Sequence, residues 1–378
     1  MKTVIKLLFI FGTRPEAIKV APLIKVMRGN SLFAISICVT AQHREMLDQV
    51  LGLFDITPDF DLNIMSENQD LTAVTTKILS GVKGVLLQSN PDLVVVHGDT
   101  ATAMAASLAA YYQQIKVAHI EAGLRTGDIY SPWPEELNRK IVADIAFLNF
   151  APTNRAKDNL LSEGVAEKTI FVTGNTVIDS LFTIIKKLEN NRALKNEVSA
   201  KFSYLRNDSK LVLITGHRRE NFGEGFKKIC IAIRSLAKAH KNVDFVYPVH
   251  LNPNVLEPVS TLLQGIENVH LIEPQDYLPF VYLIGRSYLI LTDSGGIQEE
   301  ASSLGKPVLV MRENTERPEA IESGGAKLVG VDSVQIELAT TNLLLCDLEY
   351  KKMSIISSPY GDGTAAQKIQ KVLIEAFQ

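Results

Sequence analysis

The sequence predicts an α/β protein built from two Rossmann-like domains with parallel sheets. Its 378 residues exceed the roughly 250 to 300 at which a single hydrophobic core stops growing, which favours two domains. Short runs rich in β-branched residues alternate with longer amphipathic runs, which is typical of βα units. A helical, charge-rich stretch over 180–207 separates two such series. We therefore expect domains at 1–174 and 175–363, with a last helix at 364–378 that packs back on the first domain.

Strands are expected wherever a run is short, apolar and rich in Val, Ile and Phe. In the first domain these runs cover 4–10, 34–39, 93–96, 117–120, 147–151 and 170–172. In the second domain they cover 211–214, 245–249, 269–272, 289–291, 308–310 and 327–329. Nearly every polar, glycine-bearing cluster comes just after one of these strands, where open α/β sheets bind their ligands. If the two domains face each other, both sets of clusters line one interdomain cleft.

Composition narrows the class of protein and of ligand. Hydrophobic residues make up 46% and charged residues 21%, which is ordinary for a globular protein. A formal net charge of −3 supplies no general field for nucleic acid or an anionic membrane, so we expect a small ligand. The three cysteines lie far apart without a Cys-x-x-Cys pair, which argues against disulfides and a cysteine zinc site.

Location is expected to be cytoplasmic. The apolar run 1–11 passes directly into Gly-Thr-Arg-Pro-Glu without a small-residue cleavage site, so a first strand explains it better than a signal peptide. No apolar run approaches the ~18 residues that span a bilayer, so we expect no membrane insertion.

Two glycine-bearing segments that open helices are candidate phosphate sites. In 12–16, Pro15 stands near the first helical position, and Arg14 and Lys19 add positive charge to exposed backbone amides. In 293–296, Asp-Ser-Gly-Gly, the glycines let a phosphate approach the amides of the next helix, whose first turns carry a glutamate suited to ribose hydroxyls. A capped helix with solvated charges is the alternative for each segment, and either motif alone is weakly specific.

Three carboxylates are the sharper signal for catalysis. Asp99 and Glu121 each end a predicted strand, and Glu135 follows in Pro-Trp-Pro-Glu-Glu. Acid and base work on two faces of a sugar needs at least two such groups, with pKa values that neighbours and burial move apart. For any one of them a helix cap or a surface ion pair is the alternative.

Cationic residues follow the first strand of the second domain. His217 and Arg218 there, together with Arg317, suit contact with a diphosphate leaving group, although a structural histidine beside solvated arginines explains them equally simply. The pair His97-x-Asp99 lacks a third ligand at a recognisable spacing, so no catalytic metal is expected.

Taken together, these clusters closely resemble the non-hydrolysing UDP-N-acetylglucosamine 2-epimerases of bacteria, nearly from end to end. The resemblance rests on seven motifs in order, at 12–16, 40–45, 97–100, 121–125, 216–220, 292–300 and 315–319. It implies a GT-B-type fold, a homodimer, and conversion of UDP-N-acetylglucosamine to UDP-N-acetylmannosamine for bacterial surface polysaccharides.

The same resemblance implies roles for individual residues. The catalytic residues would be Asp99, Glu121, Glu135 and His217. The substrate-binding residues would be Arg14, Lys19, Gln275, Phe280, Ser294, Gly295, Gly296, Glu300 and Arg317.

Carbon 2 of the sugar has no adjacent carbonyl, so its proton is too weakly acidic for simple removal and return. Oxidation by NAD would labilise it, but no Gly-x-Gly-x-x-Gly follows the first strand, and we expect no cofactor. The other route expels UDP from carbon 1 while a base takes the carbon 2 proton, giving 2-acetamidoglucal, to which UDP then adds back. Which carboxylate is base and which is acid stays open. The alternatives are a GT-B glycosyltransferase that uses a UDP-sugar and a catalytically silent UDP-sugar sensor.

A second ligand site is a further expectation from the resemblance. Some members of the family bind a second UDP-N-acetylglucosamine with residues that match Gln42, His43, Glu135, Arg218 and His250. The chain departs from the pattern at two positions, with Glu45 and Asn68 where regulated members carry glutamine and arginine. A carboxylate gained and a guanidinium lost both weaken a site for a diphosphate, so we expect weak activation at most.

Overall fold

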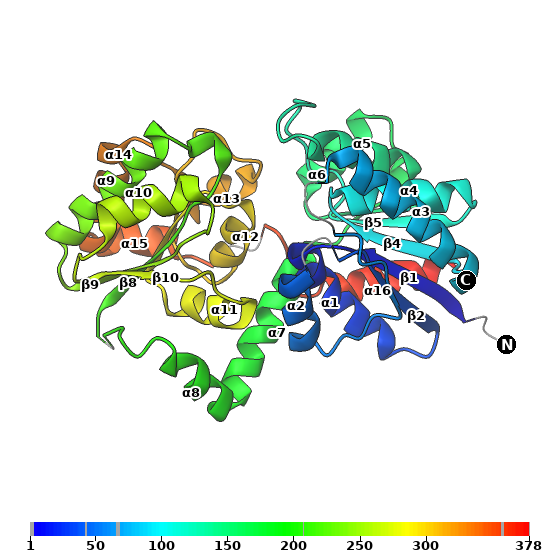
Figure 1. The fold of residues 1–378 in the computed structure, drawn as a ribbon, viewed down its shortest axis with the longest axis horizontal. Helices are drawn as coiled ribbons and strands as arrows, with labels where there is room; N and C mark the ends of the chain where they lie inside the picture. Colours follow the sequence, from blue (N-terminus) through cyan, green and yellow to red (C-terminus); the bar gives the residue numbers. More distant parts are fainter. Residues whose placement is uncertain (1–3, 42–43, 66–68, 207, 357–358, 378) are drawn as a thin grey trace. The chain divides into compact units, whose positions relative to one another are not determined.

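The computed structural model describes residues 4–41, 44–65, 69–206, 208–356 and 359–377. The chain divides into two compact units. Unit 1 contains residues 1–182 and 360–378, and unit 2 contains residues 183–359. Each unit has its own parallel sheet with helices around it, so the predicted α/β fold with two parallel-sheet domains is confirmed (Figure 1).

The sheet of unit 1 has the strand order β3-β2-β1-β4-β5-β6-β7, with every pair parallel. Its strands are β1 Ile5–Phe11, β2 Phe33–Val39, β3 Phe60–Asp61, β4 Leu93–His97, β5 Lys116–Ile120, β6 Leu148–Ala151 and β7 Ile170–Val172. The two-residue strand β3 was not predicted, because so short a run has no periodicity. The chain reverses its direction of travel across the sheet between β1 and β4, and such a switch point is where open α/β sheets bind ligands.

The helices of unit 1 cover both faces of this sheet. One face carries α3 Leu71–Ser89, α4 Ala101–Tyr112 and α5 Glu135–Ile145, which pack side by side. The other carries α1 Arg14–Arg28, α2 Arg44–Leu53 and α16 Ala365–Ala376 (Figure 1). The remaining helices are α6 Asn154–Ser162, the 3-10 turn Glu167–Thr169 and the first part of α7 Thr176–Asn190.

The C-terminal segment is held to unit 1 by specific hydrogen bonds. The buried carboxylate of Asp179 in α7 accepts the backbone amides of Ala365 and Ala366 at 3.2 and 2.9 Å, which caps the start of α16. The Gln370 side chain donates to the Val26 carbonyl at the end of α1 at 3.0 Å. These hydrogen bonds explain why α16 belongs to unit 1, although unit 2 directly precedes it in the sequence.

The sheet of unit 2 has the strand order β10-β9-β8-β11-β12-β13, also parallel throughout. Its strands are β8 Lys210–Thr215, β9 Val243–Pro248, β10 Val269–Ile272, β11 Leu289–Thr292, β12 Val308–Val310 and β13 Ala326–Leu328. Its helices are the end of α7, α8 Arg192–Ala200, the 3-10 turn Arg219–Asn221, α9 Glu224–Ala239, α10 Pro253–Leu263, α11 Tyr277–Arg286, α12 Gly295–Ser303, α13 Pro318–Glu322, α14 Ser333–Leu345 and α15 Asp347–Met353. The switch point of this sheet lies between β8 and β11.

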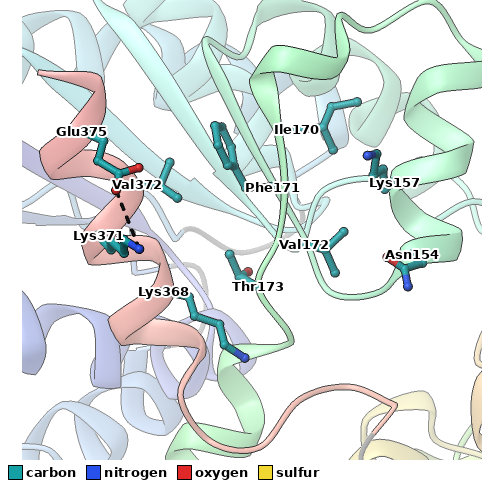
Figure 2. A pocket seen from close by; sticks show the side chains of 10 residues that line it. All are labelled: Asn154, Lys157, Ile170, Phe171, Val172, Thr173, Lys368, Lys371, Val372 and Glu375. Atoms are coloured by element: carbon teal, nitrogen blue, oxygen red, sulfur yellow. Dashed lines mark ion pairs between the residues drawn. The ribbon is translucent and has the colours of Figure 1, made fainter.

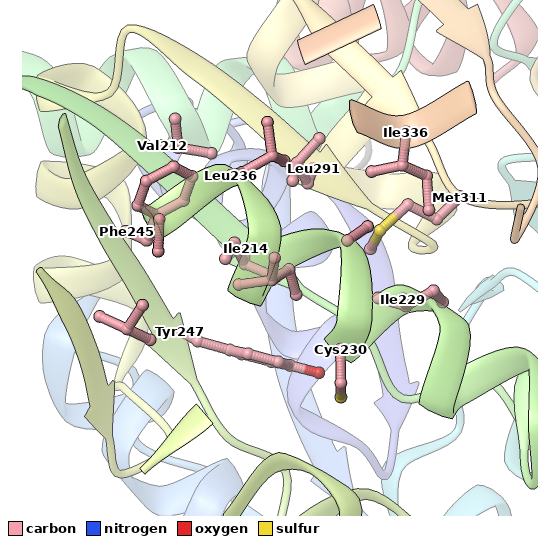
Figure 3. Packing of buried hydrophobic residues seen from close by; sticks show 14 of the residues in the cluster. Val212, Ile214, Ile229, Cys230, Leu236, Phe245, Tyr247, Leu291, Met311 and Ile336 are labelled. Atoms are coloured by element: carbon pink, nitrogen blue, oxygen red, sulfur yellow. The ribbon is translucent and has the colours of Figure 1, made fainter. Parts of the chain in front are cut away.

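The core of unit 2 positions that switch point. Apolar side chains of the central strands, such as Val212, Phe245 and Leu291, pack against α9 and α14 and are fully buried (Figure 3). Tyr247 belongs to the same cluster, and its hydroxyl donates to the Gly216 carbonyl at 2.9 Å. A buried tyrosine hydroxyl needs such a partner, and here the bond fixes the loop that follows β8.

Candidate active site

The switch point of unit 1 is organised by one buried carboxylate. Glu16 accepts the backbone amides of Gly12 and Thr13 at 3.1 and 2.8 Å, and Thr13 in turn caps α1 as the first residue of a capping box. The other carboxylate oxygen of Glu16 accepts a hydrogen bond from the hydroxyl of Thr100 at 2.7 Å. Burial raises the pKa of Glu16, and the hydrogen bonds from Thr100, Thr13 and Gly12 oppose that shift. Glu16 therefore joins the loop after β1 to the loop after β4. Arg14, two residues earlier in the chain, is half-buried.

Glu121 is the best-connected of the predicted catalytic carboxylates. It follows β5 in the left-handed backbone region, with φ at 64°, and its side chain is buried. One carboxylate oxygen, Oε2, accepts both the Lys19 ammonium at 2.5 Å and the Asn175 amide at 2.6 Å. The Nε2 atom of His97 lies 3.8 Å from the same oxygen. The structure thus brings Glu121 and Lys19, both singled out from the sequence, into direct contact.

Asp99 is held by a different set of groups at the adjacent strand end. Its carboxylate pairs with the Arg139 guanidinium at 2.6 Å, and its backbone carbonyl accepts the Asn138 amide at 2.8 Å. Arg139 also pairs with the fully buried Glu136 at 3.0 Å. Because Glu136 accepts the backbone amides of Thr126 and Gly127 as well, it ties α5 to the loop after β5.

The loop after β4 is held to strand β5 through His119. Its Nε2 atom lies 2.7 Å from the Gly98 carbonyl, and the Gly98 amide donates to the Ile120 carbonyl at 2.9 Å. Burial lowers the pKa of His119 to about 4 and that of His97 to about 3. Both imidazoles are therefore neutral at physiological pH and do not serve as cations for a phosphate.

Glu135 stands apart from these contacts. It is half-buried at the first position of α5, where its charge favours the positive end of the helix dipole. Within the part of the chain that the structure describes, no hydrogen bond or ion pair joins it to Asp99 or Glu121. All three carboxylates lie in unit 1, but only Asp99 and Glu121 follow neighbouring strands, β4 and β5.

The switch point of unit 2 is organised by Asp293, a fully buried carboxylate directly after β11. One of its oxygens accepts the backbone amides of His217 and Arg218, both at 2.9 Å. The His217 imidazole stacks on that of His250, with ring centroids 5.4 Å apart and planes 17° apart. Burial lowers the pKa of His217, which Asp293 opposes.

Charged side chains form a network beside this loop. Glu316 pairs with Arg218 at 3.2 Å and with Arg312 at 2.6 Å, and Arg312 also pairs with Glu220 at 2.5 Å. These guanidiniums outweigh burial and lower the pKa of Glu316 to about 2. Arg218 is therefore already neutralised by a carboxylate in this structure.

The helix that follows β11 presents the remaining candidates of unit 2. Ser294 is the N-cap of α12, and Gly295 and Gly296 open that helix. The buried guanidinium of Arg317 pairs with Glu299, and a Cβ atom on Gly295 would lie 3.8 Å from the Arg317 Cζ atom. An arginine thus stands at the positive end of a helix, which is a suitable environment for a phosphate.

Glu300 connects this helix to α11. It is buried and accepts the Tyr277 hydroxyl at 2.7 Å. Gln275 and Phe280 lie on either side of Tyr277 in the sequence, and both are half-buried. The Gln275 amide donates to the Glu273 carbonyl at 2.8 Å, which fixes the turn before α11.

Gln42 and His43 lie outside the described residues, as do Asn68 and the side chain of Glu45. Sequence reasoning gave no role to three residues that the structure places in the site, namely Asn175, Arg139 and Glu136, although Glu136 is the second glutamate of the Pro-Trp-Pro-Glu-Glu motif. Asn175 follows β7 in Thr-Gly-Asn, so the observation that polar clusters follow strands would have found it. Glu136 and Arg139 lie one and four residues after Glu135 on the same helix, but no local pattern shows that they are buried.

A shallow cavity of 440 Å³ lies elsewhere in unit 1, between α6, β7 and α16 (Figure 2). Its rim carries Lys157, Lys368 and Lys371, which pair with Glu167, Asp362 and Glu375 respectively. Its charges are thus matched locally, and none of the site residues above lines it.

Two further features of the described residues concern membranes and metals. None of their helices has both the length and the apolar character needed to cross a bilayer. Among the same residues, no three His, Cys, Asp or Glu side chains are grouped so that they would hold a metal ion.

Comparison with known proteins gives a consistent match over the whole chain. The sequence model of a family described as UDP-N-acetylglucosamine 2-epimerase matches residues 25–374. A curated UDP-N-acetylglucosamine 2-epimerase of Yersinia pestis is 56% identical over 368 residues, which is 97% of this chain and 98% of the relative.

Two solved structures are similar as well. The UDP-N-acetylglucosamine 2-epimerase of Neisseria meningitidis, bound to UDP-N-acetylglucosamine, has a TM-score of 0.94 and 53% identity over 98% of this chain and 100% of that one. The enzyme of Methanocaldococcus jannaschii, in complex with UDP-N-acetylglucosamine and UDP, has a TM-score of 0.84 and 35% identity, again over 98% and 100% of the two chains.

Proposed function

The chain belongs to the UDP-N-acetylglucosamine 2-epimerase family, and on that premise we propose that it interconverts UDP-N-acetylglucosamine and UDP-N-acetylmannosamine without an added cofactor. The observation that carries the proposal is the pair of carboxylates at neighbouring strand ends of unit 1. Glu121 is held by an ammonium and an amide, whereas Asp99 is held by a guanidinium. Inversion at carbon 2 needs two groups that handle protons differently, and different partners are what separate the behaviour of two carboxylates.

The chemistry proceeds by elimination and re-addition. A base removes the carbon 2 proton while the bond from carbon 1 to the UDP oxygen breaks, so that a double bond forms between carbons 1 and 2 and UDP leaves with the bonding electrons. The intermediate is 2-acetamidoglucal. An acid then protonates carbon 2 on the opposite face, and the diphosphate oxygen adds back to carbon 1. Asp99, Glu121 and Glu135 supply the proton transfers, with the assignment of base and acid left open.

Unit 2 supplies the groups that bind UDP in this proposal. The amides at the start of α12 and the Arg317 guanidinium hold the diphosphate, because a helix N-terminus and a buried arginine both favour negative charge. Glu300 accepts hydroxyls of the ribose, and Gln275 and Phe280 contact the rest of the nucleotide. Arg14 and Lys19 are the cations that unit 1 contributes in this proposal.

The cellular setting is part of the same proposal. We propose a cytoplasmic enzyme that acts as a homodimer and serves the synthesis of bacterial surface polysaccharides. The described cysteines Cys38, Cys230 and Cys346 are all free, which is compatible with a reducing compartment. We also propose that a second UDP-N-acetylglucosamine activates the enzyme only weakly, because the carboxylate of Glu45 and the lack of a guanidinium at Asn68 both weaken a site for its diphosphate.

The test is proton NMR of the purified protein with UDP-N-acetylglucosamine in deuterated water, with no NAD or metal added. We expect both the gluco and manno epimers, each with deuterium at carbon 2. Free UDP and a new glycoside that form only when an acceptor is supplied would instead support a glycosyltransferase. Binding without any deuterium incorporation would support a silent sensor.

A further inference from the structure

The two carboxylate oxygens of Asp293 differ in their hydrogen bonding. Oδ2 accepts the backbone amides of His217 and Arg218, and the Asn221 amide approaches it at 3.4 Å. Oδ1 is buried and has no hydrogen-bond partner among the described residues. Because an unsatisfied carboxylate oxygen in a buried site is costly, it indicates a partner that engages in another state of the protein.

The nearest candidate for that partner is the His217 imidazole. Its Nδ1 atom lies 3.9 Å from Oδ1 of Asp293, about 1 Å beyond hydrogen-bond distance. The backbone of the loop is fixed, because Asp293 holds two of its amides and Tyr247 holds the Gly216 carbonyl. The His217 side chain is 44% exposed, so it has the freedom to move on this fixed backbone.

We propose that Asp293 is the positioning residue for His217 in the reaction proposed above, which this inference extends. When substrate binds, Nδ1–H of His217 donates to Oδ1 of Asp293, which leaves Nε2 on the opposite side of the ring for the diphosphate. His217 then carries a proton on both nitrogens and donates a hydrogen bond to the charge that develops as UDP leaves. No covalent bond forms between His217 and the substrate.

The electrostatic surroundings of His217 explain why a carboxylate is required. Among the described residues, three titratable or charged groups act on the imidazole: Asp293 after β11, His250 after β9 and Arg218 beside it in the chain. Burial, His250 and Arg218 all lower its pKa, and Asp293 alone among them raises it. Without Asp293 the imidazole would lose its proton at lower pH. A neutral ring, without the positive charge that offsets the developing charge on UDP, would then face the diphosphate.

Asp293→Asn tests this role with little disturbance to the loop. The asparagine oxygen can occupy the position of Oδ2 and keep the bonds to the amides of His217 and Arg218. Its NH2 group then takes the position of Oδ1, so that a donor replaces the acceptor that faces His217. The corresponding change in a catalytic Asp–His pair leaves the geometry intact. Here the new NH2 group donates to Nδ1, so the ring keeps a proton on Nε2 but stays neutral.

We expect Asp293→Asn to lower kcat by ~100-fold or more while KM changes by less than ~10-fold. We expect the loss of activity with rising pH to move to lower pH, because the loss of the carboxylate lowers the pKa of His217. In the His217→Asn background the same change should reduce kcat no further, because a residue that acts through His217 has nothing left to position.

Asp244→Asn is the matched control. Asp244 is another buried carboxylate of unit 2 that lies close to a histidine, with Nε2 of His270 at 3.5 Å, but it sits at the start of β9, away from the switch point. We expect this variant to lose stability and to keep the wild-type pH profile. A pH shift equal to that of Asp293→Asn would show that the effect is general to buried carboxylates and would overturn the proposal.

A second readout does not depend on turnover. Nitrogen-15 NMR of histidine-labelled protein in the presence of UDP reports the tautomer and the pKa of His217. We expect a proton on Nδ1 in the wild type and a lower pKa in Asp293→Asn. An unchanged His217 titration in that variant overturns the positioning role even if the enzyme epimerises. A protein that does not epimerise but shows the expected titration would refute the proposed function alone.

Discussion

Gly12 is a position at which the packing of unit 1 leaves almost no room for a side chain. A Cβ atom there would lie 2.0 Å from the Thr40 hydroxyl oxygen and 2.7 Å from that of Thr102. These two hydroxyls are fully buried and hydrogen-bonded to each other at 2.9 Å. The Gly12 backbone therefore lies against the hydrogen bond between Thr40 and Thr102, which links the end of β2 to the start of α4.

Gly12→Ala should therefore destabilise unit 1 by ~3 kcal/mol. Forcing an extra methyl group into a packed site costs about 1 to 3 kcal/mol. Turning Thr40 away would leave a buried hydroxyl unsatisfied, which costs about 1 to 3 kcal/mol more. Threonine has few rotamers to offer as a way out, because its side chain is branched at Cβ.

The measurement is hydrogen exchange of peptides that cover β1 and β4, followed through a urea titration, because this reports the stability of unit 1 separately from unit 2. Gly84→Ala is the control, since a Cβ atom on that α3 glycine meets nothing within 4 Å. The same chemical change should there stabilise the unit by ~0.5 to 1 kcal/mol.

Thr40→Ala supplies the decisive comparison because it removes the closest obstructing atom. In that background Gly12→Ala should cost at least ~1 kcal/mol less than in the wild type, a coupling of the size expected for residues in contact. Thr102 still lies near the added carbon, so only partial rescue is expected. Equal costs in the two backgrounds, or a loss below ~1 kcal/mol in the wild type, would refute the steric argument.

Three further predictions follow from the site. Asp99→Asn, Glu121→Gln and Glu135→Gln should each lose ~100-fold or more in turnover and still fold, and some should release UDP and 2-acetamidoglucal; near wild-type turnover in all three would show that they are ordinary caps. In the folded protein His97 and His119 stay neutral down to about pH 3 and about pH 4, so the unfolded chain binds more protons than the folded one below pH ~6.5. The free energy of unfolding of unit 1 should therefore be highest above that pH and should fall as the pH decreases. His119→Gln should flatten this dependence in urea titrations between pH 4 and 7, and an unchanged slope would contradict the assignment. Starting from pure UDP-N-acetylmannosamine, the wild type should show little lag, whereas a long lag abolished by trace UDP-N-acetylglucosamine would prove the second site intact.

The sequence by itself determined most of the strands and their order along the chain, with the two-residue strand β3 as an exception. Strand runs such as 93–96 and 211–214 are recognisable because apolar, β-branched residues cluster over a few positions. The capping residues of α1 are equally local, since Thr13 and Glu16 are three residues apart. The polar residues that end strands identified Asp99, Glu121 and His217 as candidates, because parallel strands collect their carboxyl ends at one edge.

Only the tertiary structure decided which of these residues act together. Glu121 meets Lys19 from 102 positions away and Asn175 from 54 positions away, and Asp293 reaches back 76 positions to the amide of His217. These contacts depend on the order of strands across each sheet, which places β1 beside β4 and β8 beside β11. Periodicity along a chain carries no information about that order. The burial that sets the protonation of His97 and His119 is likewise a property of the packed sheets, so neither their neutrality nor the unpaired oxygen of Asp293 was accessible from the sequence.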